Sequence, residues 1–495
     1  MTDKELLPKD DPNDDQFEAA MADMVGKSGL EEAAERARAG AQADGMPEVL
    51  PPAFAHDSLA LELGAIWDGE ALYVPLFGKW LFWTGTHWQI DERLEHLTRT
   101  RTFIRAKVEQ CPGLPDKAKN EALKGTTIAA VANLWRSNEG IAALPGDFDC
   151  DPYLLGTPGG TVDLRDGQLR KPDPAERISK LTAVAPAGPG TPAPVFEAFL
   201  ERIFRHDLDL IPFVRRALGY ALIGKAIEHV LLFAWGMGGN GKGVLFNTCS
   251  RLLGRYAATA PPDLLLESRS ERHPTDMAML QGARLVIASE LSPGKPWDEP
   301  KLKGLTGGDP ITARYMRQDF FTFEPAFTLF VAGNTKPSFR GVDEAIRRRV
   351  LLLPFLQNIP KEERDPDLPD KLKAEWPAIL RWLIDGCLEW QKVGLQPPDS
   401  VRAATEDYLG AEDMLGQWLD ERCVLSARIG WSSLQTLFAD WKSWSEERGQ
   451  HPGTASGLGR KLDERGHQRK REAVGMGFVG IGLKEPPHSS WEERL

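Results

Sequence analysis

The chain has 495 residues, of which 42% are hydrophobic and 27% charged; this balance excludes a largely disordered chain and indicates roughly two to four folded domains. Its net charge of −12 is concentrated in residues 1–60, which carry −9, so the remainder shows no basic excess typical of extensive nucleic-acid binding. No apolar run approaches the roughly 18 residues that cross a bilayer. The five cysteines lie far apart, which argues against a disulfide framework or a zinc site. We expect a cytosolic setting and no membrane partner.

The acidic start of the chain is predicted to be unstructured. Residues 1–55 are rich in Ala, Gly and Pro and nearly free of aromatic side chains, so we predict an acidic, disordered tail. Residues 56–190 are predicted to form a smaller α+β domain. Within it, residues 71–90 predict a hairpin whose tryptophans serve a core more often than they stack on bases, and residues 91–140 follow a helical pattern.

Three aspartates at alternate positions, Asp147, Asp149 and Asp151, allow two interpretations. On a strand they could hold two metal ions. The Gly- and Asp-rich sequence that continues to Leu169 instead favours turns between short strands. Residues 183–195 are rich in Pro, Ala and Gly, which predicts a linker before the next domain.

The most informative segment combines an apolar strand, a glycine-rich turn and a helix. Residues 229–235 are continuously apolar, residues 236–243 read Gly-Met-Gly-Gly-Asn-Gly-Lys-Gly, and the next ten residues space apolar side chains as a helix does. This order is typical of a phosphate-binding loop, in which backbone N–H groups, a helix start and a lysine bind phosphates. A glycine-rich turn without a ligand is the alternative. The residues predicted to bind ATP are Gly236, Gly238, Gly239, Asn240, Gly241, Lys242, Gly243 and Val244.

Two later strands end in candidate catalytic side chains. Residues 282–290 end in Glu290, and an acid at such a strand end polarises the attacking water or supports Mg²⁺, so Glu290 is the candidate base and metal ligand. Residues 326–333 are followed by Asn334, which could orient water beside the γ-phosphate. Gly243 departs from the usual Ser or Thr that ligates Mg²⁺, so the metal is either held by other groups and water or bound weakly.

Two further segments carry candidate DNA and ATP contacts. Residues 311–316 and 320–323 predict a hairpin whose tip suits a DNA backbone, although a solvated turn has the same pattern. The predicted DNA-binding residues are Lys303, Arg314, Arg317 and Gln318. Arg348 and Arg349 precede a fourth strand and could reach the ATP of a neighbouring subunit, although a run of arginines is usually a solvated surface.

Taken in order, these segments resemble the superfamily 3 helicases, which are hexameric AAA+ ATPases of viruses and plasmids, and more closely the phage and plasmid primase–helicase family. The similarity rests on Gly-Gly-Asn-Gly-Lys242, Ala-Ser-Glu290, Leu-Thr-Gly-Gly-Asp309, Ala-Gly-Asn334 and Arg-Arg349. The hairpin of residues 71–90 and the region up to 195 resemble the small domain that precedes the helicase in this family. Family members often carry an N-terminal primase domain, and residues 1–60 are too few and too polar for one, so we expect a member without it.

The resemblance implies an α/β fold, with an AAA+-like P-loop core and a mainly parallel sheet in residues 196–360. It also implies roles for five residues. These are Lys242 on phosphate, Glu290 as the base, Asn334 as the γ-phosphate sensor, and Arg348 or Arg349 acting in trans. Ser289 stands where a second acid is common, so both departures from the pattern concern the metal.

The C-terminal part is predicted in two pieces. Residues 361–410 form a helical connector, and residues 411–495 a winged-helix-like domain. Within the latter, two helical segments precede a basic stretch and a hairpin of residues 468–475 and 477–483. Such a module can bind DNA or protein, and the pattern does not choose between them.

The resulting hypothesis is an ATP-dependent, ring-forming DNA helicase of phage or mobile-element replication. It would use ATP and Mg²⁺, assemble as a hexamer in the cytoplasm of a bacterial host cell, and translocate on single-stranded DNA to open forked DNA, with a separate primase or polymerase as a candidate partner. Two alternatives remain. One is another P-loop DNA motor, for packaging or defence, and the other is a non-catalytic DNA-binding initiator scaffold.

Overall fold

The computed structural model describes residues 52–261, 263–268, 275–289, 291–316 and 319–484. The chain divides into two compact units, Met1–Tyr73 with Asp91–Ala142, and Val74–Ile90 with Ala143–Leu495. The predicted acidic tail lies outside the described residues as far as residue 51. Among the residues described, no helix combines the length and the apolar character that crossing a bilayer would require.

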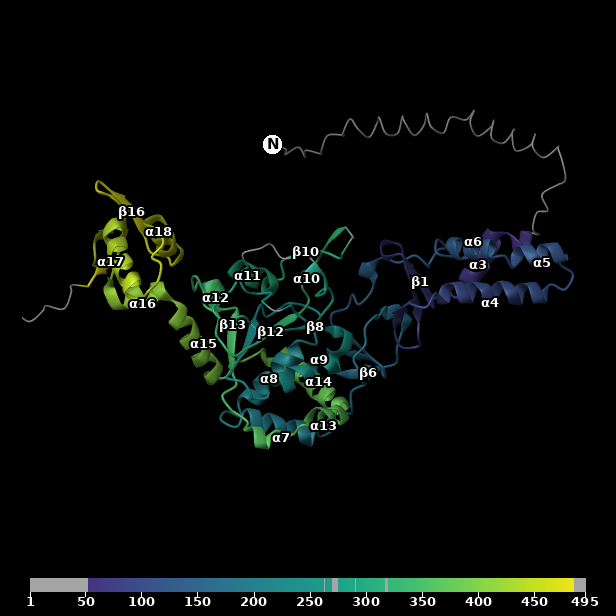
Figure 1. Cartoon of the computed structure of the whole chain (residues 1–495), viewed down its shortest axis with the longest axis horizontal. Helices are drawn as coiled ribbons and strands as arrows, with labels where there is room; N and C mark the ends of the chain where they lie inside the picture. Colours follow the sequence, from purple (N-terminus) through teal and green to yellow (C-terminus); the bar gives the residue numbers. More distant parts are fainter. Residues whose placement is uncertain (1–51, 262, 269–274, 290, 317–318, 485–495) are drawn as a thin grey trace, which may run out of the picture. The chain divides into compact units, whose positions relative to one another are not determined.

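The described part of the first unit is helical, as predicted for residues 91–140. Its helices are α3 (His56–Ile66), α4 (Glu95–Gln110), α5 (Asp116–Ala122) and α6 (Gly125–Trp135) (Figure 1). Helices α3, α4 and α6 pack on one another. Fully buried side chains on these helices include Leu59, Leu63, Ile104, Val131 and Trp135.

The predicted tryptophan hairpin is confirmed. Strand β1 (Ala71–Val74) lies where the first unit passes into the second, and β2 (Lys79–Trp83) then pairs antiparallel with β3 (Trp88–Ile90), with Trp83 opposite Trp88. Trp80 and Trp88 are only 5% and 3% exposed, so they serve the core and offer no surface on which bases could stack.

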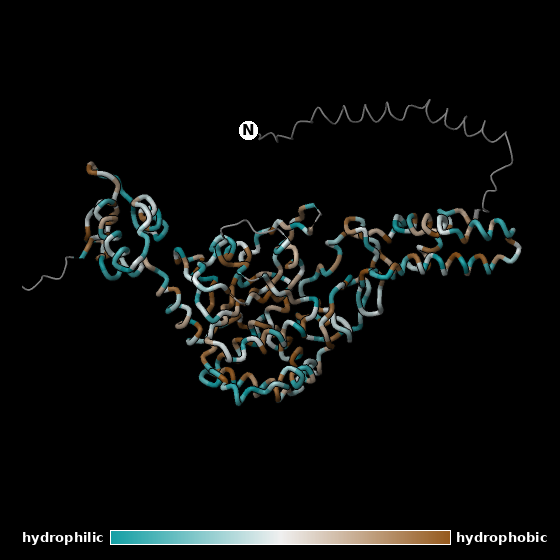
Figure 2. Tube along the Cα trace, viewed as in Figure 1, coloured by the Kyte–Doolittle hydropathy of each residue, from teal (hydrophilic) through white to brown (hydrophobic). Residues whose placement is uncertain are grey.

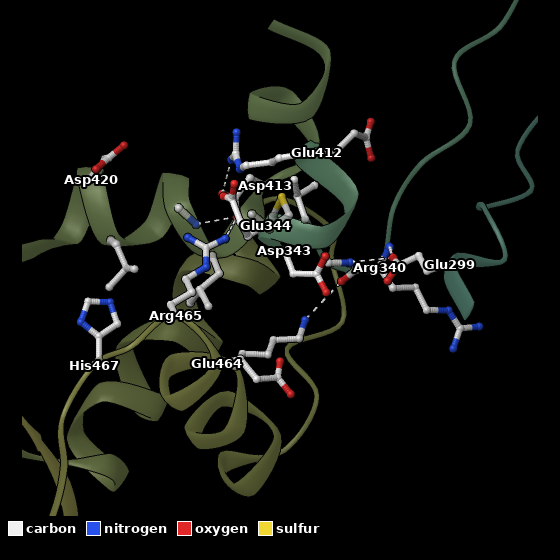
Figure 3. A pocket seen from close by; sticks show the side chains of 18 of the residues that line it. Glu299, Arg340, Asp343, Glu344, Glu412, Asp413, Asp420, Glu464, Arg465 and His467 are labelled. Atoms are coloured by element: carbon white, nitrogen blue, oxygen red, sulfur yellow. Dashed lines mark hydrogen bonds and ion pairs between the residues drawn. The ribbon is translucent and has the colours of Figure 1, made fainter. Parts of the chain in front are cut away.

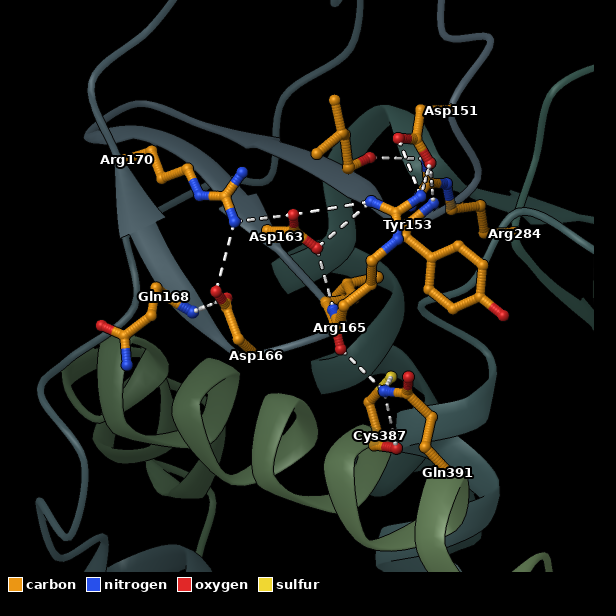
Figure 4. A network of polar contacts seen from close by, with 12 residues as sticks. Asp151, Tyr153, Asp163, Arg165, Asp166, Gln168, Arg170, Arg284, Cys387 and Gln391 are labelled. Atoms are coloured by element: carbon orange, nitrogen blue, oxygen red, sulfur yellow. Dashed lines mark hydrogen bonds and ion pairs between the residues drawn. The ribbon is translucent and has the colours of Figure 1, made fainter.

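A small antiparallel sheet follows, made of β4 (Leu154–Thr157), β5 (Gly160–Asp163) and β6 (Gln168–Arg170). The buried carboxylate of Asp163 pairs with the guanidinium groups of Arg165 and Arg170, as Figure 4 shows. Arg284 reaches this sheet from just before β9 and donates to the backbone oxygens of Leu154 and Leu222, each at 2.7 Å (Figure 4). The small sheet is therefore fastened to the central core of the second unit.

The predicted linker, residues 183–195, is also held against this core. The backbone N–H of Ala183 donates to Leu252 O, and that of Ala187 donates to Pro377 O, both at 2.8 Å. A segment rich in proline, alanine and glycine has the composition of a linker, but its small side chains also allow it to pack closely against helices. Composition alone therefore does not distinguish a free linker from a packed segment.

The three alternating aspartates have separate partners. Asp147 pairs with Arg177 and Asp151 pairs with Arg165, each at 2.8 Å, while Asp149 accepts from the backbone N–H of Ser179 at 2.9 Å. No cluster of three or more His, Cys, Asp or Glu side chains suited to a metal occurs in the described ranges. The interpretation of this segment as turns and short strands fits these contacts.

The central sheet of the second unit has five parallel strands in the order β13-β7-β12-β9-β8. The strands are β7 (Leu231–Trp235), β8 (Ala257–Thr259), β9 (Leu285–Ala288), β12 (Thr328–Gly333) and β13 (Val350–Pro354). This sheet confirms the predicted α/β class with a parallel P-loop-like core. The chain leaves β7 for the far edge at β8 and returns through β9 and β12, so the carboxyl end of β7 is a topological switch point, where ligands of such sheets bind.

Both faces of this sheet are buried, which explains why its strands are continuously apolar. In β7, Leu232 and Ala234 belong to one hydrophobic core, while Leu231 and Phe233 belong to the core on the opposite face. Figure 2 shows the hydrophobic residues gathered at the centre of this part of the chain. The helices packed against the first core are α7 (Pro194–Ile203), α8 (Leu210–Tyr220), α9 (Lys242–Leu253), α13 (Leu368–Ala374) and α14 (Trp376–Val393). The other face is covered by α10 (Thr275–Ala278), α11 (Glu299–Gly307), α12 (Glu344–Arg347) and α15 (Asp399–Glu412).

The C-terminal region has its own hydrophobic core. Its elements are α16 (Met414–Arg422), β14 (Cys423–Leu425), β15 (Trp431–Ser433), α17 (Leu434–Glu447), α18 (Ala455–Glu464), β16 (Arg469–Glu472), β17 (Gly475–Val479) and β18 (Ile481–Leu483). The two predicted helices and the final hairpin are present, and β17 lies between β15 and β16 in a three-stranded sheet. Trp418 and Trp444 are fully buried in this core, and each donates its indole N–H to a carboxylate.

One carboxylate joins this region to the central core. Asp413 is buried, accepts from the Arg347 guanidinium at 3.0 Å, and also accepts from Arg465 at the end of α18 (Figure 3). The same side chain caps α16 by accepting from the backbone N–H of Gly416 at 2.9 Å. These groups line a cavity of about 700 Å³. The end of α12, the start of α16 and the end of α18 therefore meet at one buried charge.

Candidate nucleotide-binding site

The loop between β7 and α9 has the backbone geometry of a phosphate-binding loop. Gly238, Gly239 and Gly241 have φ angles of +45°, +72° and +81°, a region that side chains other than glycine rarely adopt. Gly241 is also the N-cap of α9, so the N–H groups of the first helical turn face the loop. Consecutive N–H groups turned inward at a helix start form an anion-binding concavity.

The loop also passes close to its neighbours. A Cβ at Gly236 would lie 2.2 Å from both Asn240 Nδ2 and Phe355 O, and a Cβ at Gly241 would lie 2.4 Å from Ile203 Cγ2. Asn240 is buried and donates to Phe355 O at 3.1 Å, which ties the loop to the end of β13. The predicted residue Asn240 therefore acts on the loop's shape through this bond.

Lys242 is the buried cation of the site. It is 6% exposed, and its ammonium donates to Gly236 O at 2.5 Å and to Asn334 Oδ1 at 3.2 Å. Neither partner carries a negative charge, and burial lowers the pKa of Lys242 to about 8. Among the described residues, this buried ammonium has no carboxylate partner, and an anion such as phosphate would stabilise it.

The register of the sheet brings Asn334 to Lys242. Gly333, the last residue of β12, lies opposite Trp235, the last residue of β7, and Gly236 N–H donates to Gly333 O at 3.3 Å. Parallel neighbours end at the same edge, so the residues that follow each strand meet there. Residue 290 follows β9, the next strand of the sheet, and the predicted base Glu290 lies outside the described residues.

The position after the lysine offers no ligand for a metal. A Cβ at Gly243 would meet no atom within 4 Å, and its φ lies outside the positive region, so the space that a serine hydroxyl would use is open. The loop and Lys242 fit a nucleotide's phosphates. For Mg²⁺, Gly243 supplies no side-chain ligand at this position.

A cavity of about 720 Å³ adjoins the loop on the side of α7. Gly239, Gly241 and the predicted contact Val244 form one wall. The other walls come from α7, with Val195, Ala198, Phe199 and Arg202, and from residues 359–369. A mainly apolar cavity with a phosphate-binding loop at its edge suits the base and sugar of a nucleotide. The sequence pattern did not single out these walls, because no motif spacing marks them.

The predicted arginines lie at the opposite edge of the sheet. Arg348 and Arg349 come directly before β13, and Arg349 O accepts from the N–H of Leu231 at the start of β7 at 2.7 Å. A strand of five residues spans roughly 16 Å, so neither arginine is near the Lys242 of its own chain. Arg348 is exposed, whereas the guanidinium of Arg349 donates to Ala345 O at 3.0 Å. Both border a cavity of about 340 Å³ together with Glu228, His229 and Gly307.

The hairpin predicted for residues 311–316 and 320–323 is present, and its contact with DNA stays a prediction. Strand β10 (Ile311–Arg314) pairs antiparallel with β11 (Phe320–Phe323), and the predicted contacts Arg317 and Gln318 lie outside the described residues. The Arg314 guanidinium lies 4.8 Å from the centre of the Phe320 ring, which is itself 59% exposed. Lys303 instead forms an ion pair with Asp343 at 2.6 Å, so its ammonium is engaged with the N-cap of α12.

The fold and this site define the chain as an α/β protein with a P-loop-like core. Residues 65–205 match the family described as D5 N terminal like, and residues 234–349 match a family of unknown function, DUF5906. The "Putative helicase L207/L206" of Acanthamoeba polyphaga mimivirus is 25% identical over 393 residues, which are 71% of this chain and 40% of that protein. The "Putative helicase 022R" of Frog virus 3 (isolate Goorha) is 25% identical over 277 residues, 51% of this chain and 28% of that protein.

A third relative has the same kind of name. The "Putative helicase 184R" of Invertebrate iridescent virus 6 is 26% identical over 367 residues, 66% of this chain and 37% of that protein. The chain thus spans well under half the length of each of these relatives. Together with the D5 N terminal like region, they confirm the predicted resemblance to the phage and plasmid primase–helicase family. A solved structure of the NrS-1 C terminal region covers 86% of this chain and 98% of its own, at 12% identity and a TM-score of 0.46.

Proposed function

We propose that this chain is an ATP-dependent DNA helicase of phage or mobile-element replication that assembles as a ring and translocates on single-stranded DNA. The observation that carries the proposal is the contact between Lys242 and Asn334, made at the carboxyl edge of the sheet inside a glycine loop of the phosphate-binding type. Lys242 would hold the phosphates of ATP, and Asn334 would lie beside the terminal phosphate and orient water. Glu290 is the proposed base and ligand of Mg²⁺.

The distance between the two halves of the site supports the proposed ring. An arginine that stabilises the transition-state charge must reach the phosphates, and Arg348 and Arg349 lie at the far edge of the sheet from Lys242 of the same chain. They can serve only a neighbouring copy. Arg348 is the better candidate because its side chain is exposed, while Arg349 is tied to its own helix. A hexamer of AAA+ type, as in superfamily 3, would bring each Arg348 to the next subunit's ATP.

The DNA contact is proposed for the β10–β11 hairpin. Its described part exposes Met316 and Phe320 and holds a positive charge at Arg314. Its stem is fixed, because the Tyr315 hydroxyl donates to Ala278 O at 3.3 Å and the Tyr315 ring stacks on Phe321. A stiff hairpin with a cationic and aromatic end suits a single strand's phosphates and bases.

The C-terminal region is proposed as a winged-helix-like module. Its order of one helix, two strands, two helices and three strands supports this, and Arg469, Lys470 and Arg471 are exposed along β16. Two of these three charges are already paired, Arg469 with Asp463 and Lys470 with Glu472. We therefore assign the main DNA contact to the β10–β11 hairpin rather than to this strand.

One observation favours a second candidate function. Gly243 leaves the position after the lysine without a metal-ligating hydroxyl, which would suit a DNA-binding initiator scaffold that does not turn over ATP. ATPase activity of the purified protein, with and without single-stranded DNA, separates the two functions. The helicase predicts Mg²⁺-dependent turnover that rises with single-stranded DNA, unwinding of a forked duplex, a ring-sized particle with nucleotide, and loss of turnover in Lys242→Ala. No turnover of the intact protein at saturating ATP and DNA would favour the scaffold, and turnover without fork unwinding would favour a packaging or defence motor.

A further inference from the structure

The segment between β13 and α13 runs along the phosphate-binding loop. The backbone N–H of Ile359 donates to Gly239 O at 2.8 Å, which fixes this segment against the fourth residue of the loop. Arg364, five residues later, donates its Nε to Ile359 O at 2.9 Å. The backbone bond and the side-chain bond together hold the Arg364 guanidinium beside the loop.

The guanidinium occupies the space that a side chain at Gly239 would need. A Cβ at Gly239 would lie 2.2 Å from an Arg364 terminal nitrogen and 3.1 Å from its Cζ. The same arginine lines the cavity that adjoins the loop. It therefore stands at the border between the anion-binding loop and the space that suits a base and sugar.

The other charges around this cavity are already neutralised. Arg202 forms an ion pair with Glu363, and Asp365 forms one with Lys371 at 2.5 Å. Arg364 has no carboxylate within ion-pair distance in the part of the chain that the structure describes. Its Nε is engaged with a backbone oxygen, which leaves the two terminal nitrogens available as donors.

We propose that Arg364 binds the phosphate chain of the nucleotide held by its own P-loop. A guanidinium donates parallel hydrogen bonds to phosphate oxygens and keeps its charge at any physiological pH. Its role is distinct from that of Arg348, because Arg364 lies on the same side as Lys242 and acts in cis. The proposal rests on the nucleotide-binding function proposed above, and it adds a second cation to the site.

Equilibrium titration with ATP and with ADP tests this role. The proteins are the wild type, Arg364→Ala, Arg364→Lys and the control Lys361→Ala. Lys361 is an exposed cation of the same segment and does not line the cavity. We expect Arg364→Ala to weaken ATP binding about tenfold or more, Arg364→Lys to recover part of that loss, and Lys361→Ala to stay within about twofold of the wild type. The salt dependence of ATP binding should also fall in Arg364→Ala, because one ion pair with the ligand is gone.

The outcomes separate the two proposals. Wild-type binding of ATP together with unchanged binding by Arg364→Ala would overturn the role of Arg364 and leave the nucleotide site standing. Absence of ATP binding by the wild type would overturn the nucleotide site and the role of Arg364 with it. If Arg364 were purely structural, Arg364→Ala would lower the melting temperature of the nucleotide-free protein, and Arg364→Lys would lower it as well. We expect that melting temperature to be unchanged, since Arg364 is exposed.

Discussion

The Lys242 ammonium lies 3.2 Å from the side-chain oxygen of Asn334, although 92 positions separate the two residues along the chain. The contact exists because β7 and β12 are parallel neighbours that end in register, Trp235 beside Gly333. The amide oxygen gives the buried ammonium a partner without cancelling its charge. Among the residues that the structure describes, Lys242 therefore has no anionic partner, and a bound phosphate would stabilise its charge.

The pH dependence of ATP binding should report the titration of the buried Lys242. Burial lowers the pKa of Lys242 from 10.5 to about 8, and phosphates favour the charged form, so bound ATP raises that pKa. ATP affinity is therefore fully present below pH 8 and falls as pH rises above it, by up to about tenfold per pH unit. Isothermal titration between pH 7 and 9.5 measures the slope.

Lys242→Arg is the control for this effect, because a guanidinium stays charged throughout that range. The affinity of Lys242→Arg for ATP should be lower than that of the wild type at pH 7, since the buried pocket fits an ammonium, but it should not change with pH. An equal decline in the wild type and in Lys242→Arg would assign the titration to another group.

Gly243→Ser should strengthen the use of Mg²⁺. The φ angle at Gly243 lies outside the positive region, and a Cβ would meet no atom within 4 Å, so a serine can be accommodated. Its hydroxyl would stand where P-loop proteins place a metal ligand. We expect the Mg²⁺ concentration for half-maximal ATP binding or turnover to fall severalfold, measured by titrating Mg²⁺ at fixed ATP.

Gly243→Ala is the matched control for the hydroxyl. Both substitutions favour the helix at its first turn by a comparable amount, roughly 0.5–1 kcal/mol, and only serine adds an oxygen. An identical Mg²⁺ requirement in the serine and alanine variants would show that the metal is held away from this position.

The elements that were predicted are those whose pattern is local. Strands buried on both faces appear as apolar runs, so β7, β9, β12 and β13 could be predicted from residues 229–355, and the turn signals bounded the β10–β11 hairpin. Strand β8 was not predicted, because Ala257–Thr259 is too short to show a period. It exists because β9 offers a free edge for pairing.

The parts of the site that were missed depend on tertiary contacts. The walls of the cavity beside the loop come from α7 and from residues 359–369, and no spacing in the sequence relates them to Gly239. Lys303 is a predicted DNA contact, and only the structure shows its ion pair with Asp343. Likewise, only the structure shows that Arg348 is exposed and that Arg349 is partly buried.

Substitution of Asp413 should strongly lower the stability of the C-terminal region. Its buried carboxylate serves Arg347, Arg465 and the N-cap of α16 at once. Asp413→Ala removes the carboxylate that pairs with Arg465, leaves Arg347 with only its ion pair to Glu406, and removes the cap, which we expect to cost about 3 kcal/mol. Hydrogen exchange should show faster opening of α16 and α18, while α9 and the central sheet stay protected. Asp413→Asn keeps an oxygen for the cap and should lose less, and equal protection in all three proteins would contradict this role.

Mixing two inactive variants would show whether the arginine acts between copies. Lys242→Ala lacks the phosphate-binding cation, and Arg348→Ala lacks the exposed arginine at the opposite edge of the sheet. In a mixed ring, a subunit with intact Lys242 can face a neighbour with intact Arg348, so such junctions form a complete site even though every subunit carries one defect. We expect each variant alone to lose ATPase activity by about 10³-fold or more, and a one-to-one mixture to recover a clear fraction of it. Arg349→Ala mixed with Lys242→Ala is the matched comparison, and recovery there but not with Arg348→Ala would assign the role to Arg349. No recovery in either mixture, with assembly confirmed by particle mass, would mean that the arginines do not complete a neighbour's site.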